Sequence, residues 1–272
     1  MKIADVKELE KIAKEVRKGI IEEVYNAQSG HPGGSLSVAD ILTVLYFNEL
    51  NIHKNKPQWE DRDRFVLAKG HCSPALYSCL ANRGFFPIED LKNFRKLNSY
   101  LQGHPDMNKT PGVDMTTGSL GQGLSTAVGM AITGKMDKKD YRVYCVLGDG
   151  EIEEGQVWEA TMSAKKYALD NLCVIVDNNN LQIDGTVEEV MSPYPIDEKF
   201  KSFGFEIIKI DGHNMQEILD AFDVAKNIKG KPVCIIAKTI KGKGISFMEN
   251  QVGWHGKAPN EEQYKMAMEE LV

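Results

Sequence analysis

The sequence lacks long apolar runs, strong charge of one sign and a secretion signal. No apolar run is longer than a strand, so no segment is predicted to cross a membrane. The 272 residues carry 33 Lys and Arg against 39 Asp and Glu, a formal net charge of −6, and basic residues occur only in short groups. This charge pattern argues against a nucleic-acid partner. The charged N-terminus has no apolar core after it, which excludes an ordinary signal peptide and predicts a cytoplasmic protein.

Cysteines are few and show no Cys-x-x-Cys pair. Cys145, Cys173 and Cys234 lie in apolar, strand-like runs, and Cys72 and Cys79 lie on a predicted helix. Buried, reduced thiols explain this distribution better than disulfides or a zinc site.

No internal repeat, low-complexity tract or Pro/Ser-rich linker divides the sequence. Residues 1–272 are therefore predicted to form a single α/β domain. Its first half (1–140) reads as largely helical, and its second half (141–272) as alternating strands and helices.

The helical pattern is clearest at the start of the chain. Apolar residues recur at three- and four-residue spacing from Val6 to Val24, which predicts a helix that ends near Asn26. Three further helices are predicted in this half: residues 38–50 with Ser37 as N-cap, 70–83 and 122–136.

From residue 141 onward, short β-branched runs bounded by Gly, Pro, Asn or Asp alternate with helical patterns. The predicted strands are residues 143–147, 172–176, 206–210 and 233–237. The predicted helices between them are residues 157–168, 196–203 and 215–228. This alternation predicts a parallel sheet flanked by helices, with right-handed crossovers. Ligands in such sheets bind at the carboxyl ends of the strands.

Two strand ends carry side chains suited to a metal and a phosphate. The first is followed by Gly148-Asp149-Gly150, and the next by an Asn-rich loop that contains Asn179. These positions are about one βαβ unit apart, which brings both to the same edge of the sheet. Carboxylate, amide and carbonyl oxygens are ligands that suit Mg²⁺ with a diphosphate. Either loop alone is better explained as an ordinary turn, but the spaced pair favours a binding site.

Four of the six histidines, His31, His71, His104 and His255, lie beside glycine, a setting typical of loops that carry functional side chains. Each alone could be a turn or capping residue. His213 has a similar setting but precedes a helix, so a capping role is predicted for it. No role is predicted for His53.

A third glycine-rich loop, residues 116–123, precedes the helix predicted over 122–136. No strand precedes it, so it is not a Rossmann fingerprint, and it lacks the Gly-Lys-Ser/Thr of a Walker A loop.

Together these motifs resemble those of the thiamine diphosphate-dependent transketolases, in that family's order along the chain. The matching motifs are Ser29-Gly30-His31-Pro32-Gly33, Gly70-His71, Gly103-His104-Pro105, Thr117 to Gly123, Gly148 to Gly155 and His255-Gly256. The chain departs from many relatives at Ser119, where they have proline, and at Gly34-Ser35, where they have Ala-Pro. The resemblance implies the thiamine diphosphate-binding fold.

The resemblance also implies roles for single residues. Asp149, Asn179 and the carbonyl of Leu181 match ligands of Mg²⁺, for which Ca²⁺ or Mn²⁺ could substitute. The matches to cofactor contacts are His71, Gly118, Ser119, Leu120, Gly150, Glu151, Asn179, Ile183 and His255. The matches to catalytic residues are His31, His104 and His255, which meet the sugar and move protons, and Glu154, whose partner lies across the subunit interface.

The resemblance covers only one part of a transketolase. The pyrimidine-binding and C-terminal domains, which supply the glutamate that activates the cofactor and the arginines that grip the sugar phosphate, are not in this sequence. The chain is therefore expected to be the N-terminal subunit of a split transketolase, in a dimer of heterodimers with a C-terminal subunit. It would transfer a two-carbon ketol unit between sugar phosphates.

Three alternatives remain beside this interpretation. One is a split transketolase for a specialised sugar. Another is 1-deoxyxylulose-5-phosphate synthase, which would share the fold and the Gly-Asp-Gly motif. The histidine set, His255-Gly256 above all, favours transketolase over the synthase. A non-catalytic relative would be expected to have lost metal ligands or histidines, and this sequence keeps Asp149, Asn179 and all four histidines.

Overall fold

A five-stranded parallel sheet organises the protein, as seen in a computed structural model that describes residues 2–272. The strands are β1 (Arg64–Leu67), β2 (Val143–Gly148), β3 (Leu172–Asn178), β4 (Glu206–Asp211) and β5 (Val233–Lys238). Their order in the sheet is β1-β2-β3-β5-β4, and all neighbours run parallel. The predicted parallel sheet is confirmed, and β1 is a strand that the sequence interpretation missed in its helical half.

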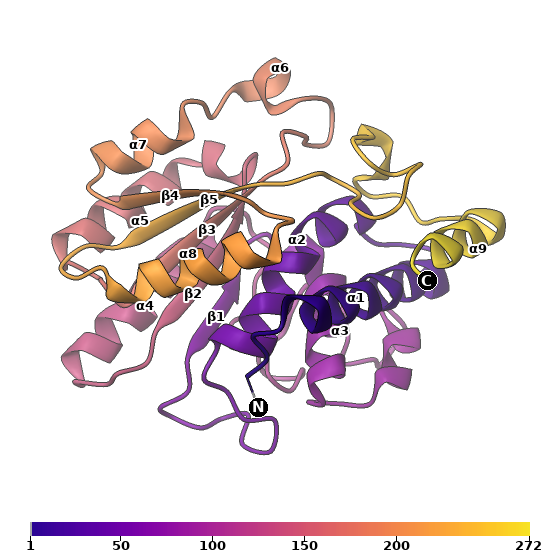
Figure 1. Ribbon diagram of the computed structural model, residues 1–272, viewed down its shortest axis with the longest axis horizontal. Helices are drawn as coiled ribbons and strands as arrows, with labels where there is room; N and C mark the ends of the chain where they lie inside the picture. The colour runs from indigo at the N-terminus through magenta and orange to yellow at the C-terminus, as the bar shows by residue number, and fades with distance from the viewer. Residues whose placement is uncertain (1) are drawn as a thin grey trace.

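Helices cover both faces of this sheet (Figure 1). One face packs on α1 (Val6–Ala27), α2 (Pro32–Val44), α3 (Ser73–Arg83) and α8 (Met215–Asn227). The other packs on α4 (Gln122–Met136), α5 (Gly155–Lys166) and α7 (Ile196–Ser202). The result is a three-layer α/β/α arrangement with two hydrophobic cores.

The remaining elements are short or terminal. They are the π-helical turn Leu45–Glu49, the 3-10 turns Gly70–Cys72, Ile88–Asn93, Glu151–Glu153 and Val252–Trp254, and the helices α6 (Val187–Met191) and α9 (Glu261–Glu270). None of the described helices is long and apolar enough to cross a membrane.

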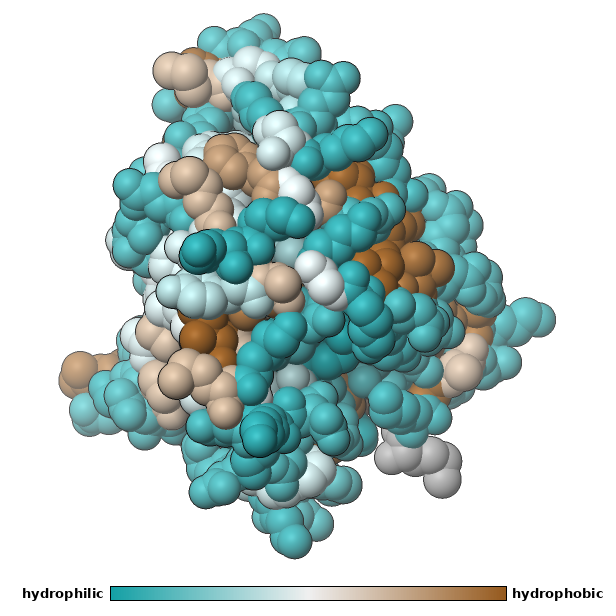
Figure 2. All heavy atoms as spheres, turned by 90° about the vertical axis from the view of Figure 1, so that its left-hand side faces the viewer, coloured by the Kyte–Doolittle hydropathy of each residue, from teal (hydrophilic) through white to brown (hydrophobic). Residues whose placement is uncertain are grey.

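The alternation of side chains along the strands explains the two hydrophobic cores. Alternate residues of β2 point to opposite faces, so Tyr144 and Val146 join the α1–α3 and α8 side while Cys145 and Leu147 join the α4–α5 side. All five cysteines are buried and free, as predicted. On the face drawn in Figure 2, apolar side chains reach the surface in patches between hydrophilic ones.

The prediction that Ser37 caps a helix is wrong. Helix α2 begins at Pro32, a residue favoured in the first turn because its missing N–H has no helical partner to lose. Ser37 is instead fully buried in the helix, where its hydroxyl donates to Asp177 at 2.6 Å.

The capping role predicted for His213 is also wrong. The side chain of Asn214 caps α8 by accepting hydrogen bonds from the N–H groups of Gln216 and Glu217. His213 turns away from the helix and lies 2.8 Å from Asp40.

Candidate active site

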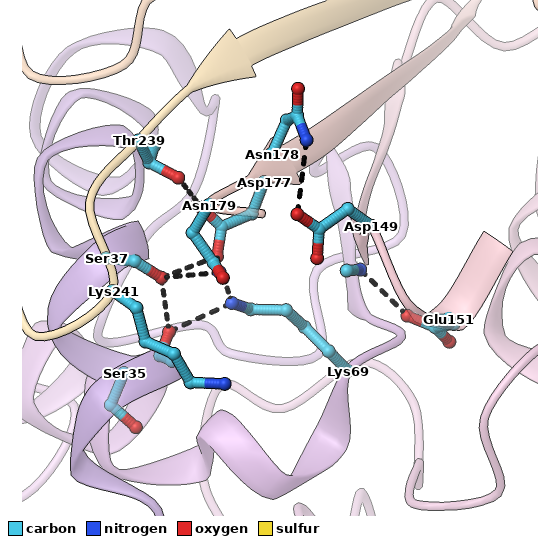
Figure 3. Close-up of polar contacts among 12 residues, drawn as sticks. Ser35, Ser37, Lys69, Asp149, Glu151, Asp177, Asn178, Asn179, Thr239 and Lys241 are labelled. Carbon is cyan, nitrogen blue, oxygen red and sulfur yellow. Dashed lines mark hydrogen bonds and ion pairs between the residues drawn. The ribbon is translucent and has the colours of Figure 1, made fainter. Parts of the chain in front are cut away.

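The carboxyl ends of β2, β3 and β5 lie side by side and carry the candidate site (Figure 3). Gly148 pairs with Asp177 in the sheet register, and Asp177 pairs with Ala237. The loops that follow these three strands therefore start side by side at the same edge of the sheet. The first turns of α2 and the turn after β1 also contribute to the site, through Ser37 and Lys69.

Asp149 is buried at the end of β2, with 2% of its surface exposed. Its carboxylate accepts hydrogen bonds from the Asn178 amide at 3.1 Å, from the Asn180 N–H, and from the Gly150 N–H at 3.0 Å. Burial, followed by the negative charge of Asp177, raises the pKa of Asp149 to about 6. A neighbouring cation would lower this pKa and favour the ionised carboxylate further.

Asn179 lies at the same edge of the sheet, but it does not contact Asp149 directly. Its amide nitrogen lies 3.3 Å from the Asp177 carboxylate and 3.5 Å from the Ser37 hydroxyl, and its amide oxygen accepts the Leu181 N–H at 3.1 Å. The Leu181 carbonyl accepts a hydrogen bond from the Lys241 ammonium at 2.9 Å. The oxygens of the predicted metal ligands thus follow two neighbouring strands, as the sequence spacing indicated.

A buried ion pair lies beneath these residues (Figure 3). The Lys69 ammonium contacts the Asp177 carboxylate and donates to the Gly34 carbonyl at 2.9 Å, while Thr239 and Ser37 also donate to Asp177. Burial alone would raise the pKa of Asp177, but the charge of Lys69 and the hydrogen bonds lower it overall. Asp177 is therefore a fixed negative charge that orients the amide of Asn179.

Three of the four predicted histidines form one cluster. The ring centroids of His31, His71 and His255 lie 5.1, 5.3 and 5.4 Å apart. Burial lowers the pKa of His31 to about 4 and that of His255 to about 3, with smaller effects from neighbouring cations, and it lowers the pKa of His71 well below its ordinary value. All three rings are consequently neutral at pH 7, and each has one nitrogen that can accept a hydrogen bond.

His104 lies on the neighbouring loop. A Cβ at Gly118 would approach its ring to 3.0 Å, so the two predicted residues are packed against each other. The Tyr77 hydroxyl holds this loop through the carbonyls of Gln102 at 2.8 Å and His104 at 3.2 Å. Burial, followed by the charge of Arg95, lowers the pKa of His104.

Glu151 ties the third glycine-rich loop to the sheet. Its buried carboxylate accepts the Gly121 N–H at 3.0 Å and the Gly148 N–H at 3.1 Å, and burial raises its pKa to about 7. The other predicted residues of this side, Ser119, Leu120, Glu154 and Ile183, are exposed. They lie around the site without contributing to the core.

Sequence reasoning missed Lys69, Asp177 and Lys241. Lys69 directly precedes Gly70-His71, Asp177 opens the Asn-rich loop, and Lys241 precedes Gly242 shortly after β5. A charged residue at a strand end was the available signal in each case. Their pairing depends on contacts between distant segments, which no single motif reveals.

No group of three or more His, Cys, Asp or Glu side chains within residues 2–272 is arranged to hold a metal ion. The predicted ligand set has a single carboxylate, Asp149, and is therefore not a site of that kind.

Comparison with known proteins is consistent with this geometry. Residues 9–271 match the family model described as transketolase, thiamine diphosphate binding domain. The 6-deoxy-6-sulfo-D-fructose transketolase subunit SqwG of Clostridium sp. (strain MSTE9) is 46% identical, over 97% of this chain and 96% of its own length. An apulose-4-phosphate transketolase subunit of Phocaeicola vulgatus is 43% identical, over 98% of this chain and 94% of its own length.

Solved structures agree with the sequence relatives. Transketolase from Campylobacter jejuni superposes with a TM-score of 0.92 and 38% identity, over 98% of this chain and 43% of that chain. The chain thus spans less than half of that transketolase, but nearly all of the two subunits named above. It belongs to the transketolase family, as an N-terminal, thiamine diphosphate-binding subunit of the split type.

Proposed function

We propose that this chain binds the diphosphate half of thiamine diphosphate with a divalent cation, and that a C-terminal partner subunit completes the active site. Together they would transfer a two-carbon ketol unit from a ketose phosphate to an aldose phosphate. The observation that carries the proposal is the convergence of Asp149, Asn179 and the histidine cluster at one edge of the sheet.

The described residues fit a polar ligand in this position. His31 Nδ1 and Thr117 Oγ1 are buried without a hydrogen-bond partner among residues 2–272, which is costly unless a ligand supplies one. Gly118 has a φ of +144°, and a side chain there would meet His104. The backbone at this point is thus shaped for close approach.

The metal would be held by three oxygens, from the side chains of Asp149 and Asn179 and from the carbonyl of Leu181. Such ligands suit Mg²⁺, and Ca²⁺ or Mn²⁺ could replace it. The charge of the cation would lower the pKa of Asp149 from about 6 and keep its carboxylate ionised.

The diphosphate would be held by Gly150, Asn179, His71 and His255. Lys241 adds a positive charge at this point, because its ammonium lies 2.9 Å from His255 Nδ1. Burial lowers the pKa of Lys241 to about 8, and a bound diphosphate would favour its charged form.

The aminopyrimidine side would be formed by Gly118, Ser119, Leu120, Glu151 and Ile183. Leu120 and Ile183 are 39% and 66% exposed, so they are available to a cofactor or a partner. Glu151 fixes the position of the loop through its bonds to Gly121 and Gly148.

Bound thiamine diphosphate supplies the nucleophilic carbon and the electron sink for cleavage of the ketose. His31, His104 and His255 would bind the sugar's hydroxyl and carbonyl oxygens and move protons at them. Their lowered pKa values keep the rings neutral at pH 7, so each ring has one nitrogen that can accept a hydrogen bond from a sugar hydroxyl and one that can donate.

The partner subunit would cover the exposed side of the site. Glu154 is exposed at the start of α5, where it would meet the partner's glutamate, and Gly129 and Gly155 have open space where a side chain would be. Small residues on α4 and α5 would let the backbone of a second protein come close. A dimer of two such heterodimers follows from two-fold symmetry.

The expected substrates are the sugar phosphates of pentose phosphate metabolism. The alternative is a specialised sugar, such as the sulfofructose or apulose phosphate in the names of two similar subunits. The cytoplasm is the expected location, since five buried, reduced cysteines suit a reducing compartment.

Asp149→Ala tests the site directly. The variant should fold, because Asp149 bonds only to groups at the ends of β2 and β3, but it should lose Mg²⁺-dependent binding of thiamine diphosphate. Binding is measured by calorimetry in the presence of the partner subunit, with Asp184→Ala, at an exposed carboxylate of the loop after β3, as control. Unchanged affinity in Asp149→Ala would contradict the proposed metal site.

A further inference from the structure

The turn that follows β5 carries Lys241 into the site. Lys241 is 2% exposed, and its ammonium reaches the carbonyl of Leu181 and the ring of His255. A lysine side chain is flexible, so its ammonium stays in one place only if the backbone that carries it is fixed. The contacts that fix residues 240–243 therefore decide where this charge lies.

Two side chains hold the turn, one on each side of Lys241. Before it, the Ile240 N–H donates to His213 Nε2 at 2.8 Å. After it, Arg17 Nε donates to the Lys243 carbonyl at 3.1 Å. Between them, the Gly242 N–H donates to the Gly33 carbonyl at 2.9 Å.

Asp40 joins the two side chains that hold the turn. Its carboxylate accepts hydrogen bonds from both terminal nitrogens of Arg17, at 2.9 and 2.6 Å, and lies 2.8 Å from His213 Nδ1. Because Nε2 of His213 accepts a hydrogen bond, Nδ1 must carry the proton and donate to Asp40. Asp40 thus fixes both the orientation and the tautomer of His213.

The three side chains form one hydrogen-bonded unit. Arg17 and Asp40 are buried, with 6% and 5% of their surfaces exposed. The backbone fits around them, since Gly244 has a φ of +92° and a Cβ there would approach Arg17 to 3.0 Å. The unit links α1, α2 and the loop after β4 to the turn after β5, segments that are distant in sequence.

We infer that Arg17, Asp40 and His213 form a clamp that positions Lys241 for the diphosphate. His213 is a positioning residue, because it acts on the site through the backbone of the turn and contacts no proposed ligand. The inference rests on the proposed function for the identity of the ligand. The clamp itself is a property of the protein alone.

Two substitutions separate the nitrogens of His213. His213→Gln places an amide oxygen near the position of Nε2, so it keeps an acceptor for the Ile240 N–H. His213→Asn places its amide near Nδ1, so it keeps a donor to Asp40 but loses the acceptor for Ile240. His53→Asn, at an exposed histidine, is the matched control.

Amide hydrogen exchange tests the clamp without any ligand. We expect the Ile240 amide to exchange at least about tenfold faster in His213→Asn, and within about threefold of the original rate in His213→Gln, for the loss of one hydrogen bond. Gly242, whose amide lies on the other side of Lys241, should lose protection in the same variant. Protection at both amides in His213→Asn equal to that in His213→Gln would overturn the clamp.

Thiamine diphosphate affinity, measured with Mg²⁺ and the partner subunit, tests the consequence for the site. His213→Asn should bind about tenfold more weakly, and His213→Gln should restore the affinity. Equal affinities in the two variants would overturn the positioning role. If the original protein binds no thiamine diphosphate, the proposed function fails, and the exchange rates still decide whether the clamp exists.

Discussion

The buried Lys69–Asp177 pair offers a test of how the site is supported. Both side chains of the pair are almost fully buried, with 2% of Lys69 and 0% of Asp177 exposed. In Lys69→Met, the Asp177 carboxylate keeps the hydrogen bonds from Ser37 and Thr239 but loses the cation that contacts it. Removal of one partner from such a pair costs about 3–5 kcal/mol, because a charge is left uncompensated. That is a large part of the stability of an ordinary domain.

The double variant Lys69→Met/Asp177→Asn should be milder. It removes both charges, so no uncompensated charge remains, and we expect it to cost at least about 2 kcal/mol less than the sum of the two single substitutions. The exposed pair of Lys135 and Asp170 is the control, with 38% and 24% of the side chains exposed. Lys135→Met should cost no more than about 1 kcal/mol.

Urea unfolding followed by circular dichroism at pH 7 gives the free energies of unfolding of the original protein, the two single variants, the double variant and Lys135→Met. Because the pair is shielded from solvent, the cost of Lys69→Met should change little between low and high salt. A cost below about 1 kcal/mol, or additive effects of the two single substitutions, would refute the view that this pair is a coupled, desolvated support for Asn179.

Three further predictions follow from the same structure. Glu23 is fully buried with no partner for either carboxyl oxygen among residues 2–272, and burial raises its pKa well above the ordinary value. This shift favours the neutral carboxyl group in the folded protein, so its contribution to stability is lost as pH rises from the unfolded pKa toward the folded pKa. Glu23→Gln should therefore become more stable than the original protein by about 1.4 kcal/mol per pH unit over that range in urea titrations, and a difference independent of pH would contradict this. His104→Ala and His255→Ala should each lower kcat of the assembled enzyme roughly 10²-fold or more, while the affinity for the cofactor changes less. A variant with the original kcat at saturating ketose would exclude a proton-transfer role for that histidine. Glu154→Gln should change the unfolding free energy by less than about 0.5 kcal/mol but lower turnover with the partner present, and full turnover would exclude a role at the interface.

Much of the fold could be predicted because its strands are short, apolar and β-branched. The predicted strands over 143–147 and 172–176 correspond to β2 and β3, which extend one and two residues further. β1 escaped detection because it has only four residues and begins with Arg64. Its place in the sheet is decided by pairing with β2, which no local pattern shows.

The start of α2 could not be predicted for a different reason. Gly33 and Gly34 read as loop residues, but a Cβ at Gly33 would lie 2.8 Å from the Trp254 carbonyl, and one at Gly34 would lie 2.8 Å from the Cys72 sulfur. Glycine is therefore needed here for close packing of a helix. Tertiary contact overrides its low helix propensity.

The candidate site was predictable where a motif lies within one loop. Asp149 and the histidines beside glycine could be named from the sequence, and His31, His71 and His255 do lie together. Lys241 and the partners of His213 could not, because their contacts join segments 60 to 226 positions apart. Each residue alone resembles an ordinary surface lysine or loop histidine.

Transketolase activity with and without the partner subunit tests the central claim most directly. The purified chain is assayed with thiamine diphosphate, Mg²⁺, xylulose 5-phosphate and ribose 5-phosphate, alone and after addition of the separately produced C-terminal subunit. If both sugars are inactive in the mixture, the sulfofructose and apulose phosphate of the similar subunits are assayed in the same way. The account predicts ketol transfer in the mixture only. Equal turnover by the chain alone, or no transfer by the mixture with any of these sugars, would contradict it.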